Sequence, residues 1–322
     1  MSAARKVAVL KGGGSLERTV SLRSGARVQH ALSRLGHDVV AIDAGQDLVT
    51  QLHECQPDAA FVALHGGDGE DGTVQGLLDV IGVPYTGSGP AGCMRATDKA
   101  LAKYLMHEAG IPTPDFTAIK ESTIKELGVA AALGDIENRL GLPLVVKPAS
   151  QGSALGVKFA RSSVELPAAI VGALSYDRKV VIERYVKGRD LAVSVIDAEE
   201  NAEDDTPQAL PIVEAIPREE EFYNYESRYE IGMTTFVCPA DLPEETTARA
   251  QQLALETYRL LGCHGVARVD LMLDAESGEL SVLETNVGPG LTETSLLPLA
   301  ADAAGIGFDQ LVARILASAF TR

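Results

Sequence analysis

RVDLMLDAESGELSVLETNVGPGLTETSL, residues 268–296, predicts a β-hairpin that opens into a glycine-containing loop. The segment 274–279 between its two apolar runs is polar and contains Gly278, which suits a turn. Alternation along each run assigns its side chains to the two faces of a sheet. One face of the first strand is expected to carry Val266, Arg268, Asp270 and Met272. The matching face of the return strand is expected to carry Leu280, Val282, Glu284 and Asn286.

The oxygen-bearing side chains of this hairpin predict a metal site. With the turn centred near Ser277, Asp270 lies opposite Glu284, and Asn286 joins them beside the guanidinium of Arg268. Two carboxylates held close together repel unless a cation lies between them. Such oxygen ligands suit Mg²⁺, which shares its remaining positions with water and substrate phosphates. The alternative is a solvated hairpin face, but a carboxylate within the apolar run VLETN is costly unless it is paired or metal-bound.

Composition places the chain among ordinary globular proteins and excludes some partners. Its 322 residues allow two or three domains, and 46% are hydrophobic while 23% are charged. A formal net charge of −17 should repel nucleic-acid backbones and anionic membrane surfaces. An acidic protein can bind an anionic ligand such as ATP only where several of its few cationic side chains lie close together. The positions of individual lysines and arginines therefore indicate where such a site could be.

The four cysteines and the N-terminus indicate a reducing compartment. Cys55, Cys93, Cys238 and Cys263 are far apart and form no CxxC pair, so they are expected to be buried free thiols rather than zinc ligands or disulfides. The apolar run near the N-terminus is too short for a signal peptide, and no stretch approaches the length of a membrane span. We therefore expect a cytoplasmic protein.

The first third of the chain predicts a parallel sheet. Strands are expected at 5–10, 38–43 and 58–64, and they alternate with helices from about 19–21 to 35 and at 46–55. A further helix is expected at about 74–80. Glycine-rich loops follow the first and third strands, at the edge where α/β folds bind ligands. These loops contain Glu17 and His65, although a purely structural role for His65 is equally consistent with the pattern.

Two motifs in these loops are excluded. The run Gly12–Gly14 is not followed by the remaining glycine of GxGxxG, so a dinucleotide-binding site is not favoured. The acidic run at Asp68, Glu70 and Asp71 lacks the spacing and the distal glutamate of an EF-hand. We interpret it as a turn-forming loop.

The middle of the chain predicts a phosphate-binding loop. A helix is expected at 91–109, and the prolines of IPTPDF (111–116) end it and mark a domain boundary. A helix at 122–140 and the strand LPLVVKPA follow, with Lys147 at the strand end immediately before SQGSALGV. Backbone N–H groups of such a loop, with one ammonium, can hold phosphate oxygens, although GxxxxGK[ST] is missing. A flexible hairpin tip with a solvated lysine remains the alternative.

The remaining elements frame a possible lid. A helix is expected at 164–175, then two strands around Lys187–Gly188, with Glu183 ending the first and Asp190 beginning the second. Residues 217–235 are charged, aromatic and aperiodic, which favours a long ordered lid over a mere connector. An amphipathic helix then ends at Gly262, and helices at 295–305 and 308–319 close the chain.

These residues together resemble the D-alanine–D-alanine ligases of the ATP-grasp superfamily, over nearly the whole chain. The resemblance is carried by VAVLKGGGSLERTVSLRSG, LHGGDGEDGTVQG, PYTGSG, DK, VVKPASQGSALGV, FYNYESRY, CPADL, RVDLML and LETNVGPGLTETSL. It implies an α/β (α+β) ATP-grasp fold with an N-terminal parallel α/β domain and two α+β domains that clamp ATP. The implied boundaries are 1–95, 96–187 and 188–322, the last part carrying the metal and catalytic residues.

The resemblance implies ATP- and Mg²⁺-dependent ligation of two D-alanines through D-alanyl phosphate, for peptidoglycan precursors, cell wall biogenesis and cell shape. It implies two Mg²⁺ ions, with Mn²⁺ as a substitute, held by Asp270, Glu284 and Asn286. ATP phosphates would be bound by Lys99, Lys147 and Arg228, under a loop containing Ser153. The adenine hinge and the ribose-binding acid would be Glu183, Val186 and Asp190. A homodimer is implied only by this resemblance, as is any K⁺ requirement.

The amino-acid substrates are assigned in the same way. Glu17 matches the residue that holds the ammonium of the first D-alanine, with His65 nearby. Tyr229 matches the lid tyrosine that joins the Ser153–Glu17 pair. Arg268 and the backbone N–H of Gly290 match the oxyanion site. The carboxylate of the second D-alanine would be held by Ser295 and the N–H of Leu296.

The chain departs from the family's usual pattern at four positions. Asp190 stands where glutamate is usual, Arg228 where many members have lysine, and Val287–Gly288 where NTSPG places two hydroxyls. These changes keep open a ligase or cyclase acting on another D-amino acid, such as D-serine. A non-catalytic nucleotide-binding protein is less consistent, because Arg268 and the metal ligands are present.

Overall fold

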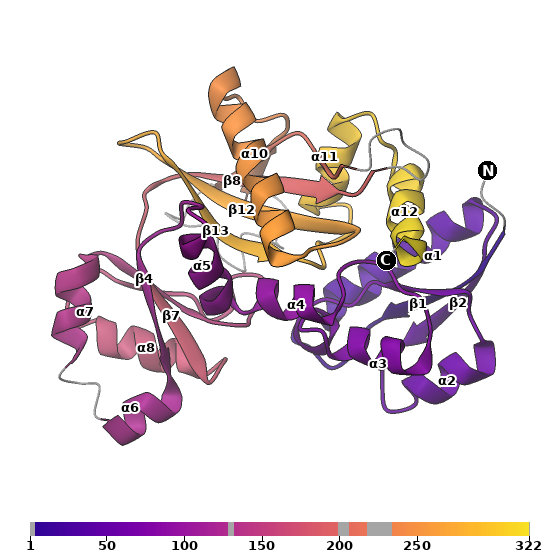
Figure 1. Cartoon of the computed structure of the whole chain (residues 1–322), viewed down its shortest axis with the longest axis horizontal. Helices are drawn as coiled ribbons and strands as arrows, with labels where there is room; N and C mark the ends of the chain where they lie inside the picture. Colours follow the sequence, from indigo (N-terminus) through magenta and orange to yellow (C-terminus); the bar gives the residue numbers. More distant parts are fainter. Residues whose placement is uncertain (1–3, 128–131, 199–205, 218–233, 322) are drawn as a thin grey trace.

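The computed structural model describes residues 4–127, 132–198, 206–217 and 234–321, and these residues build three β-sheets flanked by helices. The N-terminal sheet and the central sheet lie at opposite ends of the molecule, and the C-terminal sheet lies between and above them (Figure 1). The predicted mixture of one parallel and further antiparallel sheets is confirmed. Each sheet falls within one predicted domain range, although the boundaries themselves stay a prediction.

The N-terminal sheet is parallel and has the strand order β2-β1-β3. Its buried centre is β1, where Val7 to Leu10 are fully buried. This confirms the β-α-β-α-β prediction. The elements are β1 (Lys6–Lys11), α1 (Arg18–Arg34), β2 (Asp38–Asp43), α2 (Leu48–Cys55), β3 (Ala59–Val62), the short 3₁₀ turn η1 (Gly67–Gly69) and α3 (Thr73–Ile81).

The single helix predicted at 91–109 is wrong, because the chain breaks at Asp98 into α4 (Pro90–Thr97) and α5 (Lys99–Glu108). Asp98 has an extended backbone, and its carboxylate accepts hydrogen bonds from the N–H groups of Ala100 and Leu101. Aspartate is a preferred N-cap because its side chain satisfies these free N–H groups. The break directs Lys99, the first residue of α5, toward the central sheet, where its own N–H donates to Ala149.

The central sheet is antiparallel in the order β4-β7-β5-β6. Its helices α6, α7 and α8 pack their apolar sides around Leu144, Val146 and Ile182. The helix predicted at 122–140 is described as two helices, and residues 128–131 lie outside the description. The elements are β4 (Phe116–Lys120), α6 (Glu121–Leu127), α7 (Leu133–Leu140), β5 (Leu144–Pro148), β6 (Lys158–Ala160), α8 (Leu166–Leu174) and β7 (Lys179–Arg184).

The C-terminal sheet has the order β11-β10-β8-β12-β13, with β9 paired to β8. Helix α10 covers it and is capped by Gly262, the residue at which the sequence predicts its end; the φ of 68° at Gly262 is left-handed, as is common for a glycine C-cap. The elements are β8 (Gly188–Ile196), β9 (Gln208–Ala209), β10 (Val213–Pro217), β11 (Thr234–Val237), α10 (Glu244–Leu261), β12 (Val266–Asp274) and β13 (Leu280–Asn286).

The predicted hairpin is confirmed at its functional end but not at its turn end. Asp270 pairs with Glu284 and Arg268 with Asn286, as expected. The register then shifts, so that Leu271 pairs with Val282 and Leu283 is the extra residue of a β-bulge. One added residue reverses the alternation of side chains. The prediction that Leu280 and Val282 share a face with Glu284 is therefore wrong, since both pack into the core beneath α10.

Helix α12 (Phe308–Ala317) packs against α1, and the η3 turn (Ser318–Phe320) packs against β3, whereas α11 (Leu296–Ala303) contacts α12 and the strands β8 and β10 of the C-terminal sheet. One hydrophobic core joins Val28 and Leu32 of α1 and Phe61 of β3 to Leu311 and Ile315 of α12. In Figure 1 this contact places the end of the chain beside α1 and β1. Helices from opposite ends of the sequence therefore complete one core.

The cysteines are free, as predicted, but only Cys93 is buried, while Cys55, Cys238 and Cys263 are partly exposed. The prediction that all four thiols are buried is therefore wrong. Cys55 ends α2, Cys238 follows β11 and Cys263 follows α10, so these three lie at the ends of elements. Among the described helices none is by itself long and apolar enough to cross a membrane, and only the pair Leu296–Ala303 and Phe308–Phe320, bent by 108°, meets that test together.

Candidate active site

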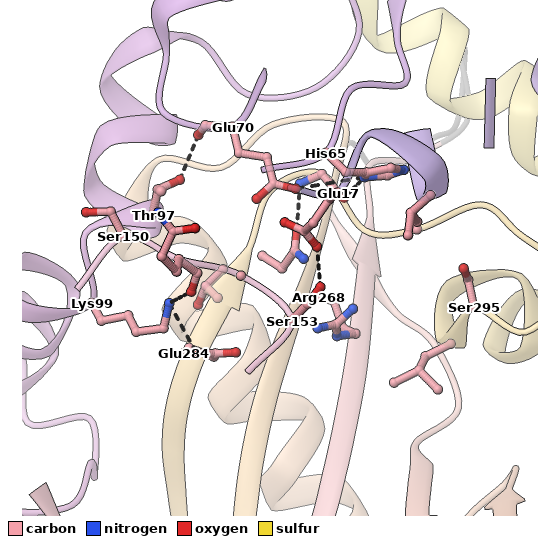
Figure 2. A pocket seen from close by; sticks show the side chains of 18 of the residues that line it. Glu17, His65, Glu70, Thr97, Lys99, Ser150, Ser153, Arg268, Glu284 and Ser295 are labelled. Atoms are coloured by element: carbon pink, nitrogen blue, oxygen red, sulfur yellow. Dashed lines mark hydrogen bonds and ion pairs between the residues drawn. The ribbon is translucent and has the colours of Figure 1, made fainter. Parts of the chain in front are cut away.

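One pocket collects predicted site residues from all three sheets (Figure 2). The loop after β1 provides Glu17, and the loop after β3 provides His65 and Glu70. Helix α5 provides Lys99, and the loop after β5 provides residues 150–153. The C-terminal hairpin and its following loop provide Arg268, Glu284, Asn286, Gly288, Gly290, Ser295 and Leu296. Sequence positions that are far apart therefore face one cavity.

Glu17 and Ser153 form a buried pair that joins the loop after β1 to the loop after β5. The Ser153 hydroxyl donates to a Glu17 carboxylate oxygen, and the two residues are 7% and 9% exposed. Figure 2 shows the two side chains pointing toward one another. Two glycines allow this approach, because a Cβ at Gly66 or Gly152 would lie 2.4 or 2.9 Å from Glu17 Oε2. The phosphate-loop candidate is thus tied directly to the N-terminal domain.

His65 is enclosed, at 5% exposure, between three elements. Its Nδ1 lies 2.8 Å from the carbonyl oxygen of Gly288, and its Nε2 lies 2.9 Å from Ser24 Oγ of α1. The ring therefore joins α1, the loop after β3 and the loop after β13. His65 therefore holds these three elements together and also lines the pocket.

Glu70 is a pocket residue that the sequence pattern did not identify. It is 8% exposed, and its Oε1 lies 3.8 Å from His65 Nδ1, whereas the neighbouring Asp68 is exposed. The acidic run forms a turn at η1, as predicted, but the prediction gave Glu70 no place in a pocket. Nothing in the acidic run separates Glu70 from Asp68, since burial depends on the loop after β13, where a Cβ at Gly288 would lie 3.0 Å from Glu70 Oε1.

The carboxylates of the hairpin are held by cations. Arg268 Nε and Nη2 lie 2.6 and 2.8 Å from the two Asp270 oxygens, which makes a bidentate pair. Lys99 Nζ lies 3.4 Å from Glu284 Oε2 and donates to the Gln151 carbonyl at 2.7 Å. Asn286 Oδ1 accepts a hydrogen bond from the Gly288 N–H at 2.8 Å. Opposite charges therefore alternate along the floor of the pocket.

The donor set at this floor fits a Mg²⁺ ion. Asp270 and Glu284 are directly cross-strand neighbours, and Asn286 follows on β13. In the described part of the chain no group of three or more His, Cys, Asp and Glu side chains is arranged to hold a metal. Two carboxylates and an amide form an incomplete oxygen shell, as Mg²⁺ sites do when water and phosphates supply the remaining ligands.

A second pocket adjoins the first and has a largely apolar lining. It is bounded by Val145, Val186, Met272 and Leu283, and its polar residues include Lys147, Glu183 and Asp190. Glu284 and Leu296 line both pockets, so the two adjoin at these residues. The bulge described above is what directs Leu283 into this second pocket. A ligand with a planar apolar group would fit the second pocket, and an anionic extension of that ligand could reach Lys99 and Arg268 in the first pocket.

Lys99 is positioned by the N-cap of its own helix. We expect Asp98→Ala to destabilise the protein by about 1 kcal/mol, because the capping carboxylate and its ion pair with Lys179 are lost. The apparent KM for a phosphate-bearing substrate should rise, because the start of α5 would no longer fix Lys99. Thermal unfolding and steady-state kinetics measure the two effects. Asp98→Asn, which keeps the capping oxygen, should lose less stability, and an unchanged KM in Asp98→Ala would refute the positioning role.

The loop after β13 holds Ser295 at the start of α11. Its hydroxyl oxygen accepts from the Thr292 N–H at 3.0 Å and lies 2.8 Å from Thr292 Oγ1. A Cβ at Gly290 would lie 2.6 Å from Ser295 Oγ, so glycine is needed there.

Val287 is 7% exposed in the core under α10, and it does not line the first pocket. Two of the predicted site residues, Arg228 and Tyr229, lie outside the described residues. So does the predicted lid at 217–235, except for residues 217, 234 and 235.

Comparison with known proteins identifies the family. The model "D-ala D-ala ligase C-terminus" matches residues 105–317, and "D-ala D-ala ligase N-terminus" matches residues 46–88. The D-alanine–D-alanine ligase of Syntrophotalea carbinolica is 42% identical and covers 99% of this chain and 97% of its own. That of Moorella thermoacetica is 44% identical and covers 97% and 98%.

A solved structure agrees with this. The D-alanine–D-alanine ligase of Bacillus anthracis complexed with ATP has a TM-score of 0.81 and 33% identity, over 99% of this chain and 98% of that one. The ATP-grasp architecture predicted from the sequence is thereby confirmed. Family models, full-length relatives and fold all lead to one result: this chain belongs to the D-alanine–D-alanine ligase family.

Proposed function

We propose that this protein uses ATP and Mg²⁺ to join two D-alanines into D-alanyl-D-alanine, releasing ADP and phosphate. The observation that carries the proposal is the pair of adjoining pockets, one polar and one largely apolar, which share Glu284 in their linings. Relatives that match the full length bear this activity in their names, and a structural neighbour binds ATP. The product would serve peptidoglycan precursor synthesis.

The nucleotide occupies the second pocket and extends toward the first. Its adenine lies between the apolar side chains near Val186 and Met272, and its ribose lies near Asp190. Lys147 and Lys99 lie on the way to the polar pocket, where ammonium groups neutralise phosphate oxygens. Arg228 is the third proposed phosphate ligand.

The first D-alanine binds in the polar pocket through its ammonium. Glu17 supplies a buried carboxylate there, already fixed by Ser153, and His65 and Glu70 lie beside it. A free carboxylate does not react with an amine, because its oxygen is a poor leaving group. Phosphorylation of the D-alanine carboxylate by ATP converts that oxygen into a good leaving group. Mg²⁺, held by Asp270, Glu284 and Asn286, supplies charge neutralisation for this transfer.

The second D-alanine binds where the loop after β13 meets α11. The Ser295 hydroxyl and the Leu296 N–H lie at the N-terminus of this helix, which favours a carboxylate. Its amine attacks the acyl phosphate, and Arg268 and the Gly290 N–H stabilise the tetrahedral oxyanion. Tyr229, which lies outside the described residues, is proposed to contact the Ser153–Glu17 pair as part of a lid that would exclude water from the acyl phosphate.

Location and assembly are also proposals. The dependence on ATP supports a cytoplasmic enzyme. A homodimer is supported by apolar side chains exposed on two packed helices, Val80 of α3 at 84% and Met94 of α4 at 53%. Light scattering in solution would measure the assembly, and a monomeric mass at working concentration would refute the dimer.

The activity is tested by measuring phosphate release from Mg·ATP with D-alanine, beside L-alanine, D-serine and D-lactate, with products identified by mass spectrometry. We expect one phosphate for each D-alanyl-D-alanine formed, and no dipeptide from L-alanine. Phosphate release only with another D-amino acid would overturn the assignment in favour of a related ligase. The structure gives that alternative little support at Val287, which packs in the core away from the first pocket.

A further inference from the structure

Lys103 of α5 is a fully buried lysine that the proposed function leaves without a role. It is 0% exposed and lines neither of the two active-site pockets. A buried ammonium is costly unless it is paired and hydrogen-bonded. Its presence one helical turn after Lys99, directly behind the nucleotide pocket, therefore calls for a specific partner.

That partner is Glu183 at the end of β7, which Lys103 shares with Lys147. Lys103 Nζ lies 2.9 Å from Glu183 Oε2, and Lys147 Nζ lies 2.6 Å from Glu183 Oε1. Glu183 is 3% exposed and Lys147 is 6% exposed. Two ammonium groups thus flank one carboxylate in an almost fully buried cluster, which carries one positive charge in excess.

The two lysines differ in their freedom to move. Lys103 is fixed from behind, because its Nζ donates to Thr113 Oγ1 at 2.5 Å, and Thr113 in turn donates to the Val282 carbonyl at 2.8 Å. Its ammonium also lies 5.4 Å from the centre of the Phe116 ring. Lys147, by contrast, lines the nucleotide pocket. Only Lys147 can turn from Glu183 toward a ligand without leaving its cavity.

Lys103 and Glu183 are both charged at neutral pH. Burial lowers the pKa of Lys103 to about 8, and the attraction of Glu183 opposes a larger fall. Burial alone would raise the pKa of Glu183, but Lys103 and Lys147 hold it below its ordinary value. Glu284 is the other acidic group whose charge reaches Lys103. The cluster is therefore an ion triad rather than a set of neutral hydrogen bonds.

We propose that Lys103 is a positioning residue whose ammonium keeps Glu183 paired when Lys147 turns to a nucleotide phosphate. Without Lys103, Lys147 and Glu183 would form a one-to-one buried ion pair. Withdrawing Lys147 would then leave a buried carboxylate unpaired, which is strongly unfavourable. Lys147 would stay on Glu183, and the phosphates would lose their ligand. This inference rests on the proposed ATP site and adds a residue behind it.

The test compares a ligand that has phosphates with one that lacks them. Isothermal titration calorimetry gives the dissociation constants of Mg·ADP and adenosine for each variant, and their ratio measures the phosphate contribution to binding. We expect Lys103→Met to reduce the preference for Mg·ADP over adenosine by about tenfold or more, with adenosine affinity nearly unchanged. Lys120→Met, an exposed lysine on β4, should leave the preference unchanged.

Two further variants keep the test decisive if Lys103→Met does not fold. Lys103→Met combined with Glu183→Gln removes the pair together, so Lys147 is no longer captured and the preference should return at least to that of the parent. Glu183→Gln alone should likewise equal or exceed the parent preference. Within each protein the ratio cancels any general loss of adenosine binding.

The contrary outcomes are distinct. Equal losses of ADP and adenosine affinity in Lys103→Met, with an unchanged ratio, would show a merely structural lysine and overturn the proposal. A reduced ratio in Glu183→Gln would overturn it too, because no carboxylate would then compete for Lys147. Absence of both ADP and adenosine binding in the parent protein would instead overturn the proposed ATP site itself, and with it this inference.

Discussion

Arg268→Ala is expected to abolish dipeptide synthesis while leaving nucleotide binding largely intact. The guanidinium is 8% exposed at the floor of the polar pocket, where it makes a bidentate pair with Asp270. It is the strongest candidate for the cation that faces the oxyanion of the attack step. Loss of one such donor typically raises the barrier by about 3–4 kcal/mol, which lowers kcat by roughly 100- to 1,000-fold.

The measurement is kcat for D-alanyl-D-alanine formation together with the dissociation constant of Mg·ADP. Arg268→Lys keeps one charge but not the two-pronged geometry, so it should recover only part of the rate. Arg259→Ala, an exposed arginine on α10, is the matched surface control and should be fully active. Turnover in Arg268→Ala within twofold of the parent would remove this residue from the reaction.

Glu284→Gln is expected to abolish metal-dependent turnover by a different route. Glu284 faces Asp270 across the hairpin, lies 3.4 Å from Lys99 and lines both pockets. An amide keeps the shape but removes the charge that attracts a divalent cation. We expect kcat to fall by about 100-fold or more and the Mg²⁺ concentration for half-maximal rate to rise.

A titration of initial rate against Mg²⁺ at saturating ATP tests this, with Mn²⁺ in a parallel series. Glu279→Gln removes a carboxylate from the exposed turn of the same hairpin and serves as the control. Should Glu284→Gln show the parent's Mg²⁺ dependence, the metal site would have to be sought elsewhere.

The sequence predicted the parts of the fold that are governed by local periodicity. The apolar run at β1 predicts a buried strand, and Val7 to Leu10 are fully buried there. The alternation along 266–273 assigns Ala267, Val269 and Leu271 to one face, and all three lie in the core beneath α10. The pairing of Asp270 with Glu284 followed from counting outward from the turn. The turn is not centred on Ser277, because Leu273 pairs with Leu280. The extra residue Leu283 shifts the register by one and so restores the expected pairing of Asp270 with Glu284.

Other features depend on contacts that a single sequence does not display. Asp98 reads as an ordinary helix residue until the docking of α5 on the central sheet and the pair with Lys179 are seen. Glu70 is buried by a loop more than two hundred residues away in sequence. Lys103 belongs to the helix predicted at 91–109, and nothing in the sequence pattern indicates that it is enclosed by the linker and by Glu183.

The shared core between α1, β3 and α12 has a consequence for biosynthesis. A ribosome makes the N-terminal sheet first, yet Leu311 and Ile315, which share a core with α1 and β3, are made about 250 residues after β3. Chains usually fold domain by domain from the N-terminus as they emerge. Here the first domain must wait, with apolar surface uncovered, until the last helices leave the exit tunnel. A nascent chain stalled before α12 would therefore be a substrate for chaperones rather than a folded half-enzyme.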